Sequence, residues 1–162
     1  MSLKIRVGFG YDVHRLVEGL DFFLGGIRIP HSRGAEGHSD ADVLIHAICD
    51  ALLGACNLRD IGFHFPNTDP RYKGIDSREL LAHCRTLLEG EGFRIVNIDS
   101  VVVAEKPKIL PYVSRMIKNI SDVLAIDPDQ VNLKATTCEG LGFVGRQEGI
   151  AAQAVCLLKR YV

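Results

Sequence analysis

Long apolar runs are missing from this sequence. Although 47% of its 162 residues are hydrophobic, no run approaches the roughly 18 apolar residues that a membrane-spanning helix needs. A soluble globular protein without a membrane role is therefore expected. An excess of one charge is missing too, because 19 basic and 20 acidic residues leave a formal net charge of -1. This balance provides no general attraction for nucleic acid, so any phosphate binding must be local.

The sequence also lacks a C-x-x-C pair, and its cysteines number five, at positions 49, 56, 84, 138 and 156. An odd count argues against a complete disulfide framework and indicates a reducing compartment. The first seven residues lack the apolar core of a secretory signal and are too few for a transit peptide, so we expect a cytoplasmic protein. The length fits one domain over residues 1–162.

Two common catalytic motifs are absent. The sequence contains neither a G-x-x-x-x-G-K-[ST] loop nor a G-x-S-x-G elbow. Nucleotide hydrolysis by a P-loop and serine hydrolysis therefore lose support.

Apolar periodicity and turn residues predict alternating strands and helices. We expect strands at 4–12, 93–104 and 131–137, two short strands within 22–29, helices at 41–55, 77–90 and 111–124, and a loop at 60–75. Ser77 is a plausible cap of the second helix. The run at 149–161 fits a buried strand and a helix equally well on its pattern alone.

The first candidate site is a metal site. Asp12 and His14 form a D-x-H pair that a strand points to one face, and His46 on the following helix offers a third ligand. Two imidazoles and one carboxylate suit a catalytic divalent ion with one open coordination position. Asp50, four residues after His46, is expected to steady the helix end of the site, with a solvated helix charge or a local hydrogen bond as the alternative. Asp42 is also four residues from His46, so one of the two carboxylates is free to face water.

Two further segments contain groups that bind ligands. The loop from Asp60 to Pro70 is dense in such groups, although ordinary turn chemistry explains it as well. The segment at 135–143 supplies Thr136 and Thr137, the carboxylate of Glu139, and glycines that let backbone amides approach an anion. This combination suits a phosphate with a magnesium ion, and the alternative is a capped turn. Arg146 and Glu148 are by default a solvated loop pair.

Four blocks of the sequence closely resemble the 2-C-methyl-D-erythritol 2,4-cyclodiphosphate synthase family of non-mevalonate isoprenoid biosynthesis. They are G-Y-D-V-H at 10–14, H-S-D-A-D-V-L-I-H at 38–46, D-I-G-F-H-F-P-N-T-D at 60–69 and K-A-T-T-C-E-G-L-G-F at 134–143, followed by G-R-Q-E-G-I-A. The resemblance spans nearly the whole chain.

The resemblance implies a reaction and its metals. Members of the family convert 4-diphosphocytidyl-2-C-methyl-D-erythritol 2-phosphate to the 2,4-cyclodiphosphate and CMP by intramolecular phosphoryl transfer, which makes them phosphorus-oxygen lyases. Asp12, His14 and His46 match the ligands of Zn²⁺ or another divalent cation. Glu139 matches the residue that holds Mg²⁺ or Mn²⁺ against the substrate diphosphate, and Thr137 completes the implied catalytic set.

The resemblance also implies substrate contacts. The implied binding residues are His38, Ser39, Asp60, Ile61, Gly62, Phe65, Asn67, Asp69, Ala104, Lys108, Ile109, Leu110, Thr136, Thr137, Phe143 and Arg146. Among them, the main chain near Ala104 and 108–110 would read the cytosine. Phe143 and Arg146, with Glu148, match positions near a central cavity where some members bind an isoprenoid diphosphate. Three positions depart from the family pattern, namely Asn67 in place of a frequent aspartate, Phe9 in place of a histidine, and Lys106 in place of a smaller residue.

The expected fold is α+β, with a mixed sheet of about four strands and helices on one face. From the resemblance, we expect a homotrimer with the other sheet faces toward the central axis, and a strand at 149–161. Two alternatives remain. The same three ligands would also serve a phosphoesterase that activates water, and a non-enzymatic member would bind an isoprenoid diphosphate without metal-dependent turnover.

Overall fold

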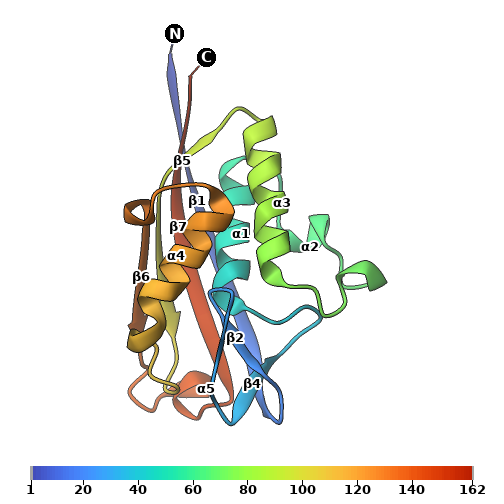
Figure 1. The fold of residues 1–162 in the computed structure, drawn as a ribbon, viewed down its shortest axis with the longest axis vertical. Helices are drawn as coiled ribbons and strands as arrows, with labels where there is room; N and C mark the ends of the chain where they lie inside the picture. The colour runs from blue at the N-terminus through green and yellow to red at the C-terminus, as the bar shows by residue number, and fades with distance from the viewer. Residues whose placement is uncertain (1, 162) are drawn as a thin grey trace.

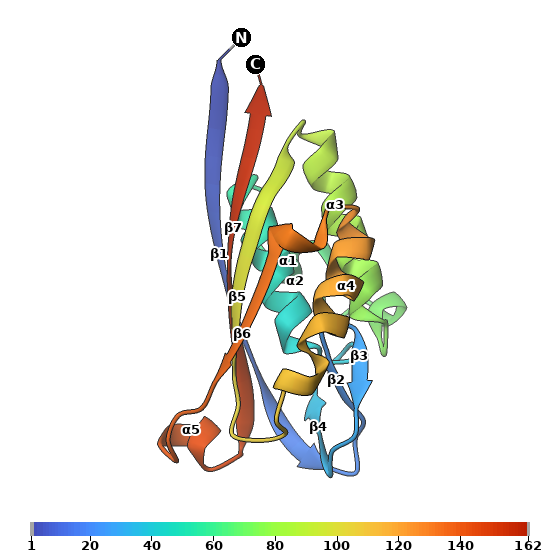
Figure 2. The same ribbon diagram turned by 60° about the vertical axis from the view of Figure 1, so that its left-hand side comes forward.

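A computed structural model describes residues 2–161 as an α+β domain with one large sheet (Figures 1 and 2). Its elements in chain order are β1 (Leu3–Glu18), β2 (Phe22–Leu24), β3 (Ile27–Ile29), β4 (Arg33–Glu36), α1 (Val43–Ala55), α2 (Ile61–His64), α3 (Ser77–Gly90), β5 (Arg94–Val103), α4 (Val113–Leu124), β6 (Val131–Thr136), α5 (Gly142–Gly145) and β7 (Gly149–Tyr161). Short 3₁₀ turns lie at Pro70–Tyr72, Leu110–Tyr112 and Pro128–Gln130.

The large sheet has the strand order β4-β1-β7-β5-β6, and β2 and β3 form a separate hairpin. Only the pair β5–β6 is parallel in that order, so the sheet is mixed as expected. It has five strands where about four were expected. The additional strand is β4, whose sequence R-G-A-E lacks an apolar period. It finds a partner because β1 continues to Glu18, well past the predicted end at residue 12.

The last strand settles the ambiguity at 149–161 in favour of a strand. β7 lies between β1 and β5 and pairs with both of them in antiparallel register. Its run of small and aliphatic residues suits this place, because a strand at the centre of a sheet covered by helices is buried along most of its length.

Helices α1, α3 and α4 cover one face of the sheet (Figure 2). Helix α1 begins at Asp42, whose side chain accepts a hydrogen bond from the backbone N–H of Ile45 and caps the first turn. The helix is buried on nearly all sides, because it packs against β1 and β7 on one side and against α3 on the other. None of the helices within residues 2–161 has the length and apolar character that crossing a bilayer requires.

The opposite face of β1 carries a row of apolar side chains that no helix or strand of residues 2–161 covers (Figure 2). Alternate residues of this strand point away from the helices, and they remain between 43% and 66% exposed: Ile5, Val7, Phe9, Tyr11 and Val13. A contiguous exposed apolar strip of this kind is typical of an interaction surface.

Two glycines let α1 approach β1 at backbone distance. A Cβ atom at Gly8 would lie 1.8 Å from the carbonyl oxygen of Ala51, and one at Gly10 would lie 1.9 Å from that of Ala47. Any larger residue at either position must push the helix away from the strand. The helix carries His46 and the strand carries Asp12 and His14, so this contact sets the distance between the candidate ligands.

We expect Gly10→Ala to lower the free energy of unfolding by at least about 3 kcal/mol, because backbone atoms cannot rotate out of the way of the new methyl group. Chemical denaturation measures this change. Gly54→Ala is the matched control on α1, where a Cβ meets nothing within 4 Å, and it should raise stability by about 0.5–1 kcal/mol. Equal stabilities of the two variants would contradict the role of the close approach.

Candidate metal and substrate site

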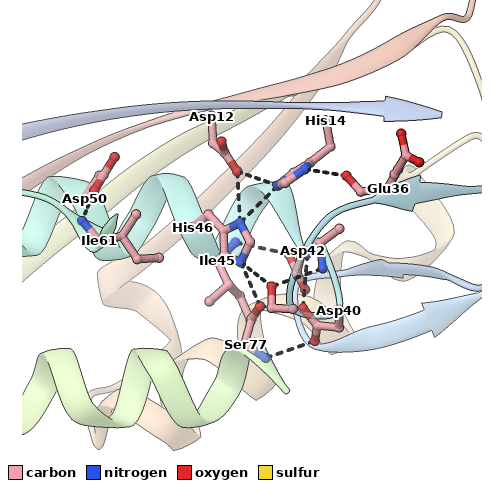
Figure 3. A network of polar contacts seen from close by, with 12 residues as sticks. Asp12, His14, Glu36, Asp40, Asp42, Ile45, His46, Asp50, Ile61 and Ser77 are labelled. Carbon is pink, nitrogen blue, oxygen red and sulfur yellow. Dashed lines mark hydrogen bonds and ion pairs between the residues drawn. The ribbon is translucent and has the colours of Figure 1, made fainter. Parts of the chain in front are cut away.

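Three ligand atoms converge between β1 and α1 (Figure 3). Asp12 Oδ2 lies 2.9 Å from His14 Nε2 and 3.0 Å from His46 Nδ1, and the two ring nitrogens are 3.1 Å apart. Asp12 and His14 share a face of β1 because strand side chains alternate. The structure therefore brings together the three residues that the sequence predicted as ligands.

The outer contacts of both imidazoles fix where their lone pairs point. The backbone carbonyl oxygen of Glu36 lies 2.9 Å from His14 Nδ1, so Nδ1 donates and Nε2 is free. On the other ring, His46 Nε2 lies 3.0 Å from Ser77 Oγ, and this hydroxyl donates its proton to Asp40. Ser77 Oγ must then accept from His46 Nε2–H, which leaves His46 Nδ1 free. Both free nitrogens face Asp12.

This donor set fits a divalent cation. With the two tautomers fixed, three hydrogen-bond acceptors lie within 3.1 Å of one another and none of them carries a proton to share. Ligand atoms of a tetrahedral zinc are about 3.3 Å apart, given Zn–N bonds of about 2.0–2.1 Å. Two nitrogens and one carboxylate oxygen leave one coordination position for water or substrate, as in catalytic sites.

The pKa shifts of Asp12 and His14 also indicate that this site favours a positive charge. Burial opposes the charge on Asp12, but the hydrogen bonds that His14 and His46 donate to it when their facing nitrogens are protonated outweigh burial and lower the pKa of this carboxyl to about 2. Burial likewise disfavours charged His14, whereas its hydrogen bond to Asp12 raises its pKa above the ordinary value. A proton and a metal ion compete for the same lone pairs, so metal binding should release protons.

The two neighbouring carboxylates have roles that the sequence did not reveal. Asp42 does not face water: it is fully buried, and besides capping α1 it accepts hydrogen bonds from the amides of Gly25 and Gly26. Asp50 was expected to support His46, but the alternative of a local hydrogen bond holds instead, because its carboxylate accepts from the amide of Ile61 at 2.7 Å (Figure 3). It therefore positions α2 instead of a ligand.

Support for His46 comes from Ser77 and Asp40, which the sequence analysis did not identify as site residues. Ser77 was expected to cap α3, but Asp76 is the cap, and Ser77 is the first helical residue and fully buried. Asp40 binds both the hydroxyl and the amide of Ser77. The sequence signal was weak, because a serine beside an aspartate at a helix start is ordinary capping chemistry.

A cleft of about 230 Å³ opens beside the metal ligands. Six predicted substrate residues line it together with His14 and His46, and three apolar or aromatic residues complete the lining without having been predicted. The lining residues are His14, His38, Ser39, His46, Ile61, Gly62, Phe65, Asn67, Tyr72, Ile75 and Leu80. The two other predicted residues of this loop act locally, because Asp60 caps α2 and Asp69 caps the turn at Pro70–Tyr72.

The remaining predicted residues form a second group at the ends of β5 and β6. The amide of Ala104 donates to the carbonyl of Thr136, which joins the segment at 104–110 to the segment at 136–140. Thr137 Oγ1 donates to Glu139 at 3.1 Å, and both residues are exposed. Ile109 is buried, whereas Lys108 and Leu110 are exposed. None of this group lines the cleft at the metal ligands, and Figure 1 shows β6 and α2 on opposite sides of the molecule.

Two expectations concern the loops between β6 and β7: free amides at 135–143 that bind phosphate, and an exposed pair of Arg146 with Glu148. The amides of the segment at 135–143 are not all free for phosphate, because those of Cys138 and Gly140 donate to Glu105. Arg146 forms the predicted exposed pair with Glu148 through two contacts of 3.0 Å. Phe143 lines a separate cleft near Glu148 and His14.

The fold and the site define an α+β domain in which three residues that could hold a metal ion lie beside a cleft. The family model of the YgbB family matches residues 5–159, and the chain belongs to this family. Over 154 residues it is 60% identical to 2-C-methyl-D-erythritol 2,4-cyclodiphosphate synthase of Agathobacter rectalis. This alignment covers 95% of this chain and 87% of the relative.

Solved structures agree with this assignment. The bifunctional IspDF of Campylobacter jejuni is 41% identical with a TM-score of 0.95, and the match covers 99% of this chain and 43% of the bifunctional chain. The IspF of Plasmodium falciparum in its CDP complex is 38% identical with a TM-score of 0.84, and the match covers 95% of each chain.

We expect Ser77→Ala to weaken zinc binding by about tenfold, because His46 loses a partner that fixes its tautomer and Ser39 Oγ remains as the other. Competition with a chromophoric chelator measures the affinity. Ser121→Ala is the control, since Ser121 is also buried but bonds only the carbonyl of Lys118 on α4. Equal zinc affinities of the two variants would contradict the proposed contribution of Ser77.

Proposed function

We propose that this protein converts 4-diphosphocytidyl-2-C-methyl-D-erythritol 2-phosphate to 2-C-methyl-D-erythritol 2,4-cyclodiphosphate and CMP in isoprenoid precursor biosynthesis, as a phosphorus-oxygen lyase of the cytoplasm. The observation that carries the proposal is the convergence of Asp12, His14 and His46 on one open position beside a cleft. Relatives of 56–60% identity are named as this synthase, and related structures are named as CDP complexes.

Two groups of residues would hold the metals. Asp12, His14 and His46 supply the donor set of Zn²⁺ or another divalent cation, and Glu139 would hold Mg²⁺ or Mn²⁺ with the substrate diphosphate. Bound cations of this kind withdraw charge from phosphoryl oxygens and lower the barrier to their substitution. Thr137 keeps the carboxylate of Glu139 oriented through its hydrogen bond.

The reaction needs positioning and no protein nucleophile. An oxygen of the 2-phosphate attacks the β-phosphorus, and the bond from this phosphorus to the oxygen of CMP breaks. His38, Ser39 and Asn67 lie on the cleft wall, where their polar groups can hold the phosphate and the erythritol hydroxyls. Holding the attacking and leaving oxygens in line supplies most of the acceleration.

The cytidine would bind at the second group of residues. Backbone groups near Ala104, Lys108, Ile109 and Leu110 would read the base edge, and Thr136 and Thr137 would bind the phosphates. A carboxylate and two hydroxyls at the surface suit a hydrated cation with a diphosphate. This half of the site lies apart from the metal cleft within one described chain.

A homotrimer would join the two halves. The uncovered apolar strip of β1 supports a trimer with the sheets facing the central axis, because burying this strip removes large aliphatic and aromatic side chains from water. Each complete site would then consist of the metal cleft of one chain and the residues at the ends of β5 and β6 of the neighbouring chain. Phe143 and Arg146 would lie near the axis, where an isoprenoid diphosphate is a candidate ligand.

Incubation of the protein with the cytidine substrate, zinc and magnesium tests the proposal directly. Phosphorus NMR should show the coupled signals of a cyclic diphosphate together with CMP, and a chelator should abolish both. CMP with a linear diphosphate would indicate a phosphoesterase instead. Unchanged substrate would contradict enzymatic function.

We expect His46→Ala to abolish turnover and zinc binding, because two ligands at this site cannot replace three. The trimer should remain intact in analytical ultracentrifugation. His31→Ala is the control, since His31 packs against Phe22 and belongs neither to the ligand group nor to the cleft lining, and it should retain both activity and zinc. An active His46→Ala variant would show that His46 is not a required ligand.

A further inference from the structure

Glu105 connects the two segments of the second group. It follows Ala104 after the end of β5, and its Oε1 accepts hydrogen bonds from the amide of Cys138 at 2.8 Å and from the amide of Gly140 at 3.3 Å. One half-buried carboxylate oxygen therefore binds both sides of Glu139, the predicted magnesium ligand.

The backbone of this loop has a conformation that needs such a contact. Glu139 has φ 51° and Gly140 has φ 76°, and side chains rarely occupy this left-handed region because their Cβ meets the carbonyl. The amides of Cys138 and Gly140 converge on one oxygen of Glu105, and backbone amides that converge in this way at a turn form a concave anion-binding nest. The protein fills this nest with its own carboxylate, so the substrate diphosphate cannot use the same two amides.

The loop conformation in turn sets the direction of Glu139. The amide of Glu139 donates to Thr137 Oγ1, and this hydroxyl lies 3.1 Å from Glu139 Oε1. Both Thr137 and Glu139 are exposed, so the carboxylate is open to a ligand from solvent. Within residues 2–161, Glu105 is the only side chain of the segment at 104–110 that is hydrogen-bonded to this loop.

We propose that Glu105 is a positioning residue for the proposed reaction. By accepting hydrogen bonds from the amides of Cys138 and Gly140, its carboxylate holds Thr137 and Glu139 in place for the metal-bound diphosphate. The same contacts fix the distance of Thr137 and Glu139 from the segment at 104–110, which would read the cytosine. This inference rests on the proposed function. Glu105 has no hydrogen bond to Asp12, His14 or His46, so the effect of replacing it should be separable from zinc binding.

Cys138 provides a readout that does not depend on activity. It is partly exposed, whereas the other four cysteines are buried. A thiol reagent should label Cys138 at least about fivefold faster in Glu105→Ala than in the wild type, because the loop loses two hydrogen bonds. Glu105→Gln retains an oxygen acceptor without the charge and should label within about twofold of the wild type. Glu91→Ala, at an exposed glutamate, is the control and should not change the rate.

Kinetics then test the effect on the reaction. Glu105→Ala should lower kcat at least about tenfold and raise the magnesium concentration needed for half-maximal rate, with zinc affinity and melting temperature unchanged. Glu105→Gln should restore most of the rate. Wild-type labelling and kinetics in Glu105→Ala would overturn the inference, as would an equal loss of rate in Glu105→Gln. An inactive wild type would refute the proposed function instead, and the labelling rates would still decide whether Glu105 holds the loop.

Discussion

The backbone contact between α1 and β1 is the constraint on which the site depends. Gly8 and Gly10 bring the strand within reach of the carbonyls of Ala51 and Ala47, closer than any side chain would allow. This approach places His46 of the helix 3.0 Å from Asp12 of the strand. A metal site needs its ligand atoms positioned within tenths of an ångström, and rigid elements in direct backbone contact provide that precision better than loops do.

Hydrogen bonds outside the three candidate ligands make this geometry suitable for a cation. The carbonyl of Glu36 accepts a hydrogen bond from His14, and the hydroxyl of Ser77 accepts one from His46. The remaining lone pair of each ring therefore points toward Asp12. Asp40 orients the Ser77 hydroxyl and also binds its amide at the start of α3. The position of one metal ligand is therefore coupled to the packing of α3 and of the segment that precedes α1.

The sequence predicted most of the fold because its elements have strong local signals. The apolar period of α1 and the β-branched run of β5 needed no tertiary information, and the D-x-H pair predicted ligands on one strand face. β4 was missed because a strand of four residues forms only where a partner edge exists. The prediction that Asp50 supports His46 failed for a related reason. Helical spacing shows which residues lie near His46, but it does not show which backbone amide will bind the carboxylate. Ser77 and Glu105 act across long sequence separations, so no local pattern marks them.

In the proposed function the chain supplies two partial sites, the cleft beside Asp12, His14 and His46 and the surface loop beyond β6, and a homotrimer would join them across subunits. The central claim is that the first of these sites binds zinc. Anomalous diffraction at the zinc absorption edge, from crystals of the zinc-loaded protein, tests that claim most directly. A single peak bonded to Asp12 Oδ2, His14 Nε2 and His46 Nδ1 is the predicted result. A zinc ion bound through His46 Nε2, or one held elsewhere with these three atoms unliganded, would contradict it.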